Sequence, residues 1–226
     1  MSTLYVIGTP IGNLDDLAPR AVEALQTIKL LLCEDTRVTQ RILERHNITV
    51  PKLNSYREDS HAEKSALAVE ALLAGDDVGF TSDAGTPGIC DPGARLVAEV
   101  IAKVPEVRVV PIPGPCAATT LLSASGFPAD EFVFLGFAPH KGRERFFRDL
   151  AAEPRTAVFY ESPHRAEKAF AAMAELMPER RICVGRELTK LHETIYRGTA
   201  TEIPALTAAT SGKGEFVIAV SKISKS

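Results

Sequence analysis

The sequence of 226 residues has no tryptophan, only four cysteines and no long hydrophobic run. The cysteines lie far apart, without Cys-x-x-Cys spacing or a nearby histidine pair, so neither a zinc site nor a disulfide framework is expected. No stretch approaches the roughly 18 consecutive apolar residues of a membrane span, and the amino terminus has no signal pattern. We therefore expect a cytoplasmic protein with reduced thiols, no bound metal and no membrane segment. The cysteines are Cys33, Cys90, Cys116 and Cys183.

The charge is unevenly distributed along the chain. The net charge of −3 argues against a general nucleic-acid coat protein. However, residues 1–112 carry 11 Lys and Arg against 16 Asp and Glu, whereas residues 113–226 carry 15 against 13. Four cations fall within eight residues of the second half. Such a run is either a solvated helix face or an edge that contacts phosphates. The four are Lys141, Arg143, Arg145 and Arg148.

Short apolar runs alternate with amphipathic stretches, which predicts βαβ units and a largely parallel sheet. Three prolines and a glycine at 111–115 interrupt this rhythm, so two α/β domains are expected, 1–112 and 113–226. Expected strands are Thr3–Gly8, Lys29–Cys33, Asp77–Thr81, Arg108–Ile112, Glu131–Phe137, Thr156–Tyr160, Arg181–Gly185 and Glu215–Val220, with an extra antiparallel strand at Glu193–Gly198. Expected helices are Arg20–Ile28, Arg37–His46, His61–Leu73, Ala94–Lys103, Ala117–Ala124, Arg143–Ala152 and Arg165–Met177.

The most informative loop is Ser82–Gly93, which follows an apolar strand and holds three glycines, two prolines and two aspartates. In an open α/β sheet, ligands bind at the carboxyl ends of strands, and glycines let the backbone approach a ligand closely. A simpler reading makes Asp91 the N-cap and Pro92 the first residue of the next helix. That reading leaves Ser82–Gly88 unexplained, so we expect a ligand loop there.

Other loops at strand ends also carry candidate groups. Gly8–Leu14 follows the first strand, but a proline and only two glycines exclude a dinucleotide fingerprint. The segment Glu34–Arg37 has two readings. Either Asp35 only caps the next helix and Arg37 is solvated, or Arg37 or the acids form part of the floor of a cleft. The small residues of Pro113–Thr120 either let a flat ligand group approach the backbone at the start of a helix or allow that helix to pack closely against the sheet.

Two loops of the second half carry reactive side chains. In Phe159–Arg165, Ser162 is the expected N-cap and Pro163 the first helical residue, which would leave His164 as a surface residue. Arg186–Glu193 is dense in groups that can hold phosphate or move a proton. These strand-end loops together point to one site rather than to unrelated turns.

In order along the chain, these motifs resemble the tetrapyrrole methylase superfamily, and most closely its ribosomal branch. Many members of that branch continue into a small helical domain after the last strand, which this sequence lacks, although shorter members are known. The motifs are Gly8-Thr9-Pro10-Ile11-Gly12-Asn13-Leu14, Glu34-Asp35-Thr36-Arg37, Ser82-Asp83-Ala84-Gly85-Thr86-Pro87-Gly88-Ile89, Pro113-Gly114, Tyr160-Glu161-Ser162-Pro163-His164-Arg165, Arg186-Glu187-Leu188-Thr189-Lys190 and Gly214-Glu215-Phe216-Val217.

The resemblance implies that S-adenosylmethionine binds in a cleft between two α/β domains. It also implies 2′-O-methylation of a cytidine ribose in small-subunit (16S) ribosomal RNA by a homodimer. The residues implied at the cofactor are Gly8, Pro10, Asp83, Ala84, Gly85, Thr86, Pro87, Gly88, Ile89, Gly114, Ala117 and Ala118.

Transfer to a ribose hydroxyl benefits from a group that takes its proton. Our candidates for it are Glu161, His164, Glu187 and Lys190. Candidate RNA contacts are Arg37, Lys141, Arg143, Arg145, Arg148 and Arg186. Two alternatives stay open: a corrin or porphyrin methyltransferase, for which 6% aromatic residues offer few stacking platforms, and a nucleotide-binding module without activity.

Overall fold

The structure is a computed structural model that describes residues 1–210 and 213–223. It divides the chain into two compact units, Met1–Cys116 and Ala117–Ser226. The domain boundary expected from the sequence, after residue 112, lies four residues before this division. Each unit has its own five-stranded sheet and its own hydrophobic core.

The sheet of the first unit is parallel throughout. Its strands β1 (Thr3–Ile7), β2 (Leu30–Cys33), β3 (Lys52–Ser55), β4 (Val78–Thr81) and β5 (Arg108–Ile112) lie in the order β3-β2-β4-β1-β5. Every pairing between neighbours is parallel, as the alternating pattern predicted. The edge strand β3 was missed because its sequence, Lys-Leu-Asn-Ser, holds one apolar residue.

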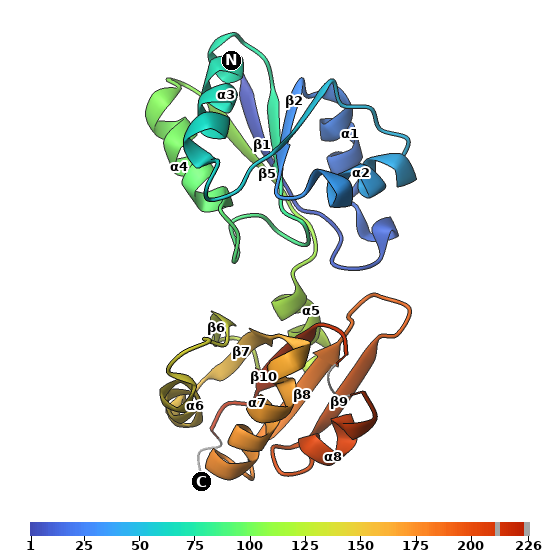
Figure 1. The fold of residues 1–226 in the computed structure, drawn as a ribbon, viewed down its shortest axis with the longest axis vertical. Helices are drawn as coiled ribbons and strands as arrows, with labels where there is room; N and C mark the ends of the chain where they lie inside the picture. The colour runs from blue at the N-terminus through green and yellow to red at the C-terminus, as the bar shows by residue number, and fades with distance from the viewer. Residues whose placement is uncertain (211–212, 224–226) are drawn as a thin grey trace. The chain divides into compact units, whose positions relative to one another are not determined.

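Helices cover both faces of this sheet (Figure 1). On one face lie α1 (Pro19–Thr27) and α2 (Thr36–Arg45), and on the other α3 (His61–Leu73) and α4 (Gly93–Lys103). Successive residues of a strand point to opposite faces, so Leu31 packs with α1 and α2 while Leu30 and Leu32 pack with α3 and α4. This double coverage explains why the strands read as continuous apolar runs.

The sheet of the second unit is mixed, so the expectation of a largely parallel sheet is wrong for this half. Its strands β6 (Phe132–Phe137), β7 (Thr156–Glu161), β8 (Arg181–Arg186), β9 (Thr194–Thr199) and β10 (Phe216–Val220) lie in the order β6-β7-β10-β8-β9. Only β6 and β7 pair in parallel; β10 runs antiparallel to both β7 and β8. The connection from β8 to β9 is too short for a crossover helix, which forces an antiparallel pair there. The extra antiparallel strand is confirmed.

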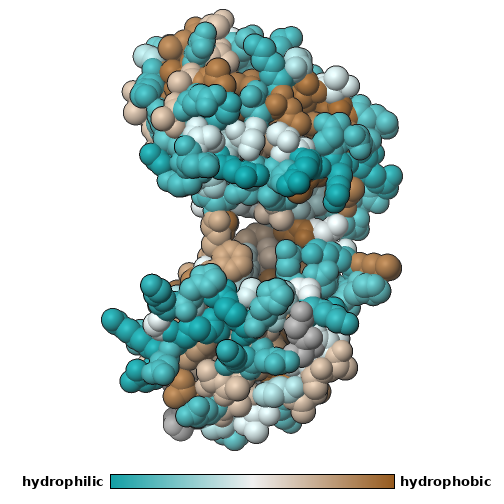
Figure 2. All heavy atoms as spheres, in the orientation of Figure 1, coloured by the Kyte–Doolittle hydropathy of each residue, from teal (hydrophilic) through white to brown (hydrophobic). Residues whose placement is uncertain are grey.

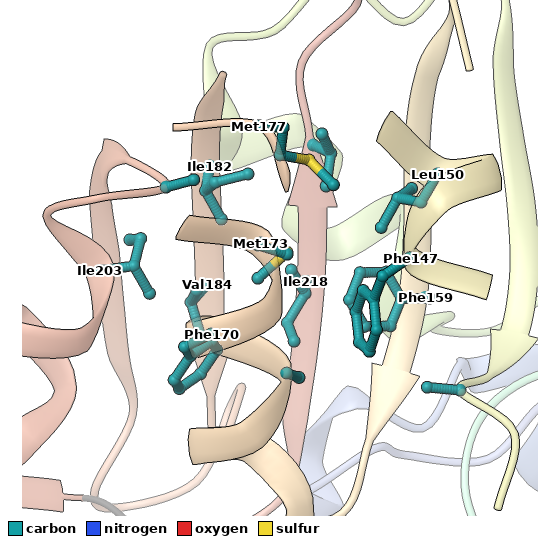
Figure 3. Close-up of a cluster of buried hydrophobic side chains, with 14 of the residues drawn as sticks. Phe147, Leu150, Phe159, Phe170, Met173, Met177, Ile182, Val184, Ile203 and Ile218 are labelled. Carbon is teal, nitrogen blue, oxygen red and sulfur yellow. The ribbon is translucent and has the colours of Figure 1, made fainter. Parts of the chain in front are cut away.

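Helices α6 (Arg143–Ala152), α7 (Pro163–Leu176) and the short α8 (Ile203–Thr207) bury their apolar side chains against one face of this sheet. Figure 3 shows Phe170 and Met173 of α7 beside Ile218 of β10, with Phe147 of α6 against Phe159 of β7. Helix α5 (Ala117–Ser125) packs against β8 and β10. Helical spacing predicted all of these except α8, which is too short to show a period.

The face drawn in Figure 2 is mostly hydrophilic on each unit, with hydrophobic residues scattered among the polar ones. Within the described ranges, no helix combines the length and the apolar character needed to cross a membrane.

Candidate functional site

The candidate site of the first unit lies where its parallel strands end. Strands β2, β4, β1 and β5 are consecutive neighbours in the sheet and run in one direction, so the loops that follow them meet at one edge. These are the loops that the sequence singled out. They are Glu34–Asp35, Ser82–Gly93, Gly8–Leu14 and Pro113–Cys116.

A two-residue bridge joins the first loop to the Ser82–Gly93 loop. The backbone N–H of Thr9 donates to the carbonyl of Gly85 at 2.9 Å, and that of Gly85 donates to the carbonyl of Thr9 at 3.1 Å. The Thr9 hydroxyl, itself buried, donates to the carbonyl oxygens of Ser82 and Gly85 at 3.2 and 3.3 Å. The two loops are therefore fixed to each other rather than free to move apart.

A close approach of two glycines joins the loops after β1 and β5. A Cβ atom built on Gly114 would lie 2.8 Å from the backbone of Gly8, and one on Gly8 would lie 2.7 Å from that of Gly114. Only glycine fits at either position without moving the backbone. The Thr86 hydroxyl then donates to the carbonyl oxygens of Gly114 and Pro115 at 3.3 and 3.1 Å, which ties in the third loop.

Asp91 holds the far end of the Ser82–Gly93 loop. Its carboxylate accepts hydrogen bonds from the backbone N–H groups of Gly88, Ile89 and Gly93, at 2.7 to 3.1 Å. The expected capping is wrong by one residue: α4 begins at Gly93 with Pro92 as its N-cap. Asp91 still satisfies an N–H of the helix start, but it also anchors Gly88 and Ile89 of the loop.

The acids after β2 form a reciprocal pair with the loop. The backbone N–H of Asp35 donates to Asp83 Oδ1 at 2.8 Å, and the backbone N–H of Asp83 donates to Glu34 Oε2 at 2.9 Å. Asp35 also caps α2 by accepting from the Arg37 N–H, as predicted. The Arg37 guanidinium beside Asp35 holds the pKa of that carboxyl well below its usual range. The Arg37 side chain is 83% exposed.

A cavity of about 280 Å³ opens beside this pair. Burial raises the pKa of Glu34; the Asp83 N–H opposes this shift, whereas the carboxylates of Asp83 and Asp91 add to it. The sequence analysis found the acids but not Arg57 and Glu58, because they follow the strand β3 that it missed. The cavity is lined by Glu34, Arg57, Glu58, Asp83 and Pro92.

A buried hydrogen-bonded chain supports the segment that carries Arg57. The Tyr56 N–H donates to the Cys33 carbonyl at 2.7 Å, and the Tyr56 hydroxyl lies 2.6 Å from His61 Nδ1. His61 Nε2 in turn lies 2.6 Å from Glu99 Oε2 of α4. Burial raises the pKa of Tyr56 to about 12, so the hydroxyl stays protonated and can donate. This chain fixes the end of β3 against α3 and α4.

In the second unit, the fully buried Glu161 binds two arginines. Its Oε2 lies 2.7 Å from Arg143 Nη2 and its Oε1 lies 3.0 Å from Arg165 Nη2. The Ser162 N–H also donates to Oε1 at 2.7 Å. Both carboxylate oxygens are engaged, which disfavours Glu161 as a general base. As predicted, Ser162 is the N-cap of α7 and Pro163 its first residue, but the Ser162 hydroxyl accepts from Arg165 rather than capping the backbone.

The loop after β8 is held by a lysine between two carboxylates. Lys190 Nζ lies 3.0 Å from Glu187 Oε1 and 2.9 Å from Glu215 Oε2. Burial works against the charge of Lys190, but the two carboxylates outweigh it and raise the Lys190 pKa. Burial also raises the Glu187 pKa, but the Glu215 N–H and Lys190 outweigh it, so the net shift is downward. A protonated amine and a stabilised carboxylate are both poor proton acceptors.

This loop is also strained. Glu187 and Thr189 have φ of +51° and +65°, in the left-handed region that side chains other than glycine rarely adopt. Arg186 holds the loop from one side by donating to the carbonyls of Lys213 and His192, at 2.8 and 3.1 Å. Such strain is found at ligand sites more often than elsewhere, so this loop stays a candidate.

The basic run divides into one inward and three outward cations. Arg143 is bound to Glu161 and lies over the Phe147 ring, at 5.3 Å from its centroid. Lys141, Arg145 and Arg148 are exposed, and Arg148 lines a groove of about 360 Å³ between α6 and α7.

Of the remaining predicted site residues in the second unit, His164 is exposed in the first turn of α7. Ala117 and Ala118 begin α5, and Ala118 is buried.

Comparison with known proteins decides the family. The family model of the tetrapyrrole (corrin/porphyrin) methylases matches residues 3–204. The chain belongs to this family. It is 42% identical over 223 residues to the ribosomal RNA small subunit methyltransferase I of Synechocystis, covering 97% of this chain and 79% of that protein. The protein of the same name from Thermotoga maritima is 38% identical, with 98% and 99% covered.

Solved structures confirm the fold. The uroporphyrin-III-C-methyltransferase of Thermus thermophilus covers 98% of this chain and 95% of its own, with a TM-score of 0.67 and 19% identity. A cobalt precorrin-4 methyltransferase gives a TM-score of 0.70 at 17% identity, with 96% of this chain and 94% of its own covered. The two α/β domains of this family, expected from the motifs, are therefore confirmed.

We predict that Glu161→Ala lowers the free energy of unfolding of the second unit by about 3–5 kcal/mol, because it leaves two partly buried guanidinium groups without their counter-ion. Arg143→Ala should cost less, since Arg165 still balances Glu161. In urea unfolding, the double variant should lose less than the sum of the single losses. The exposed pair Arg145 and Asp149 is the control, for which strict additivity is expected. Additive losses for Glu161 and Arg143 would contradict the coupling.

Proposed function

We propose that this protein is an S-adenosylmethionine-dependent methyltransferase that methylates the 2′-hydroxyl of a cytidine ribose in small-subunit (16S) ribosomal RNA. The observation that carries the proposal is the 38–43% identity, over almost the whole chain, to proteins named ribosomal RNA small subunit methyltransferase I. The loops gathered at the carboxyl edge of the first sheet, where α/β sheets bind their ligands, support it. A ribosomal substrate also implies a cytoplasmic location.

The residues present fit the cofactor. The Thr9–Gly85 bridge and the Gly8–Gly114 approach form a compact floor of backbone, and Ala84, Gly88 and Ile89 are exposed beside it. A Cβ on Gly88 would meet the Ala94 backbone nitrogen at 3.9 Å, an ordinary van der Waals contact, so the loop is not crowded there. When bound, the cofactor supplies an electrophilic methyl group. The residues of the first unit proposed to hold it are Gly8, Pro10, Asp83–Ile89 and Gly114.

Methyl transfer from a sulfonium to an oxygen is a direct displacement, so the protein must align the two reactants and exclude water. Such positioning contributes about 7–11 kcal/mol to lowering the barrier. A ribose hydroxyl is a weak nucleophile at neutral pH, so a side chain that takes its proton adds about 10²–10⁴-fold. Among the described residues, no group of three or more His, Cys, Asp and Glu is placed to hold a metal ion.

The exposed cations of the second unit are the proposed phosphate contacts. Lys141, just before α6, and Arg145 and Arg148 of α6 are exposed; Arg145 lies 3.6 Å from Asp149 in a loose exposed pair, whereas Arg143 serves Glu161. Arg186 is engaged with backbone carbonyls, and Arg37 of the first unit is exposed but paired with Asp35. We therefore place more weight on the three outward cations than on the other candidates. A homodimer, implied by the family, is part of the proposal.

The competing activity is methylation of a corrin or porphyrin. The solved structures with such names are 17–20% identical to this chain, and that likeness concerns the fold alone. The relatives at about twice that identity are named for ribosomal RNA. We therefore favour the RNA substrate.

The first test is transfer of a tritiated methyl group from S-adenosylmethionine to small ribosomal subunits from a strain that lacks the enzyme. We expect one methyl group per subunit, on a cytidine ribose, and none on subunits from the parent strain. Transfer to a porphyrin or corrin with no transfer to subunits would overturn the RNA assignment.

The cofactor floor makes a second prediction. Gly114→Ala pushes a Cβ into the Gly8 backbone, so it should shift the loops and weaken S-adenosylmethionine binding by at least about tenfold, which is about 1.4 kcal/mol. Gly75→Ala is the control: its Cβ meets nothing within 4 Å, and its φ of +91° imposes a backbone cost far from the loops. Calorimetric titration should show normal affinity for Gly75→Ala. Equal affinities for both variants would refute the proposed floor.

The outward cations make a third prediction, on RNA affinity. Each phosphate neutralised by a cation releases counter-ions, so binding weakens as salt rises. Removing one contact should flatten the slope of log affinity against log salt by about 0.7–0.9. For the double variant Arg145→Ala with Arg148→Ala, we expect twice that change in slope and an unchanged turnover of bound subunits. The control is Lys103→Ala, at an exposed residue of α4, for which the slope should not change. An unaltered slope in the double variant would make the run an ordinary solvated helix face.

A further inference from the structure

Three of the four base candidates that the sequence offered, Glu161, Glu187 and Lys190, are held by charged partners, whereas the fourth, His164, is exposed in the first turn of α7. Glu161 has both oxygens in ion pairs, and Lys190 is held protonated between two carboxylates. Glu187 shares its Oε1 between Lys190 and the Glu215 N–H. Glu34, at the proposed cofactor loop, is a further carboxylate to consider.

Glu34 has the geometry that those residues lack. It follows β2 at the carboxyl edge of the first sheet, where its Oε2 accepts from the Asp83 N–H of the proposed cofactor loop at 2.9 Å. That bond fixes the side chain beside the loop. Its Oε1 has no hydrogen-bond partner among the described residues, and the side chain lines the cavity of about 280 Å³. A carboxylate oriented by one hydrogen bond thus lines an open space next to the loop.

The lining of the cavity selects the kind of group that can enter. Carboxylates from three elements face it: Glu34 after β2, Asp83 after β4 and Glu58 after β3, with the single cation Arg57. This balance disfavours a phosphate inside the cavity but admits the sugar ring of a nucleotide whose flanking phosphates lie outside it. The volume is just below the roughly 300–1,000 Å³ of sites that enclose a drug-sized ligand, which fits one nucleoside better than a tetrapyrrole.

We propose that Glu34 is the general base of the reaction, and that the cavity beside it receives the ribose of the target nucleotide. This inference rests on the proposed function. The Glu34 carboxylate takes the proton of the 2′-hydroxyl as the oxygen forms its bond to the methyl carbon and the carbon–sulfur bond of the cofactor breaks. The sulfur keeps that electron pair, which leaves S-adenosylhomocysteine, a 2′-O-methyl ribose and a protonated Glu34 that returns its proton to water.

The environment also gives Glu34 the strength of a base. Burial raises its pKa, the Asp83 N–H opposes this, and the carboxylates of Asp83 and Asp91 raise it further, while Arg57 lowers it. Asp35 and Glu58 are the other charged groups at this edge, and each is paired with an arginine. A carboxylate whose pKa is raised accepts a proton more readily than an ordinary one.

The test is Glu34→Gln, in the full chain acting on small ribosomal subunits. The Gln carbonyl can still accept from the Asp83 N–H, so folding and S-adenosylmethionine affinity should persist while single-turnover methyl transfer falls by about 10²–10⁴-fold. Glu34→Asp keeps the carboxylate but moves it, so its rate of methyl transfer should lie between those of the parent protein and Glu34→Gln. Glu63→Gln is the matched control, because Glu63 is exposed on α3 and pairs only with Lys64.

A pH profile separates a base from a merely structural residue. For the parent protein, transfer should rise with pH as Glu34 loses its proton, with a midpoint above the ordinary value of about 4.3 for Glu, and then level off. In Glu34→Gln this rise should vanish. Retention of the parent rate and profile would overturn the assignment, and so would lost cofactor affinity, since the cavity would then belong to the cofactor. A parent protein inactive on subunits would instead overturn the proposed function itself.

Discussion

The close approach of Gly8 and Gly114 is the constraint on which the candidate site depends. Because neither residue has a side chain, the loops after β1 and β5 touch through backbone atoms. The loop after β4 is then bound to both, through the Thr9–Gly85 bridge and the Thr86 hydroxyl. A side chain at either glycine would separate the loops, and the backbone surface proposed to hold a cofactor would no longer be continuous. The parallel sheet supplies the edge, and the two glycines make it one surface.

The two units use strand-end carboxylates in opposite ways. Glu161 is enclosed by two guanidinium groups and a backbone N–H, so its charge is fully compensated and its role is to hold α6 and α7 at the end of β7. Glu34 has one N–H, a free oxygen and other carboxylates nearby. Full compensation gives a rigid structural charge, whereas partial compensation leaves a reactive one. Both glutamates end a strand, and only their surroundings separate the two roles.

Most of the elements could be predicted because their signals are local. The period of apolar residues gave α3 and α6 their observed bounds, and the buried strands of the first sheet were continuous apolar runs. The strand β3 escaped because an edge strand with one apolar residue has no such signal, and with it Arg57 and Glu58 of the cavity were missed. The position of β10 between β7 and β8 also escaped, because strand order is set by contacts between distant segments rather than by local spacing.

The sequence by itself determined the family, the two α/β halves and the loops that carry chemistry, since these follow from motif order, local periodicity and the glycines that tight turns require. Only the tertiary structure decided which charged groups meet. Arg143 and Glu161 lie 18 residues apart and Glu34 and Asp83 lie 49 apart, yet these contacts separate an enclosed carboxylate from an open one. A side chain's charge is written in the sequence, but its basicity depends on burial and on neighbours that the fold brings from elsewhere in the chain.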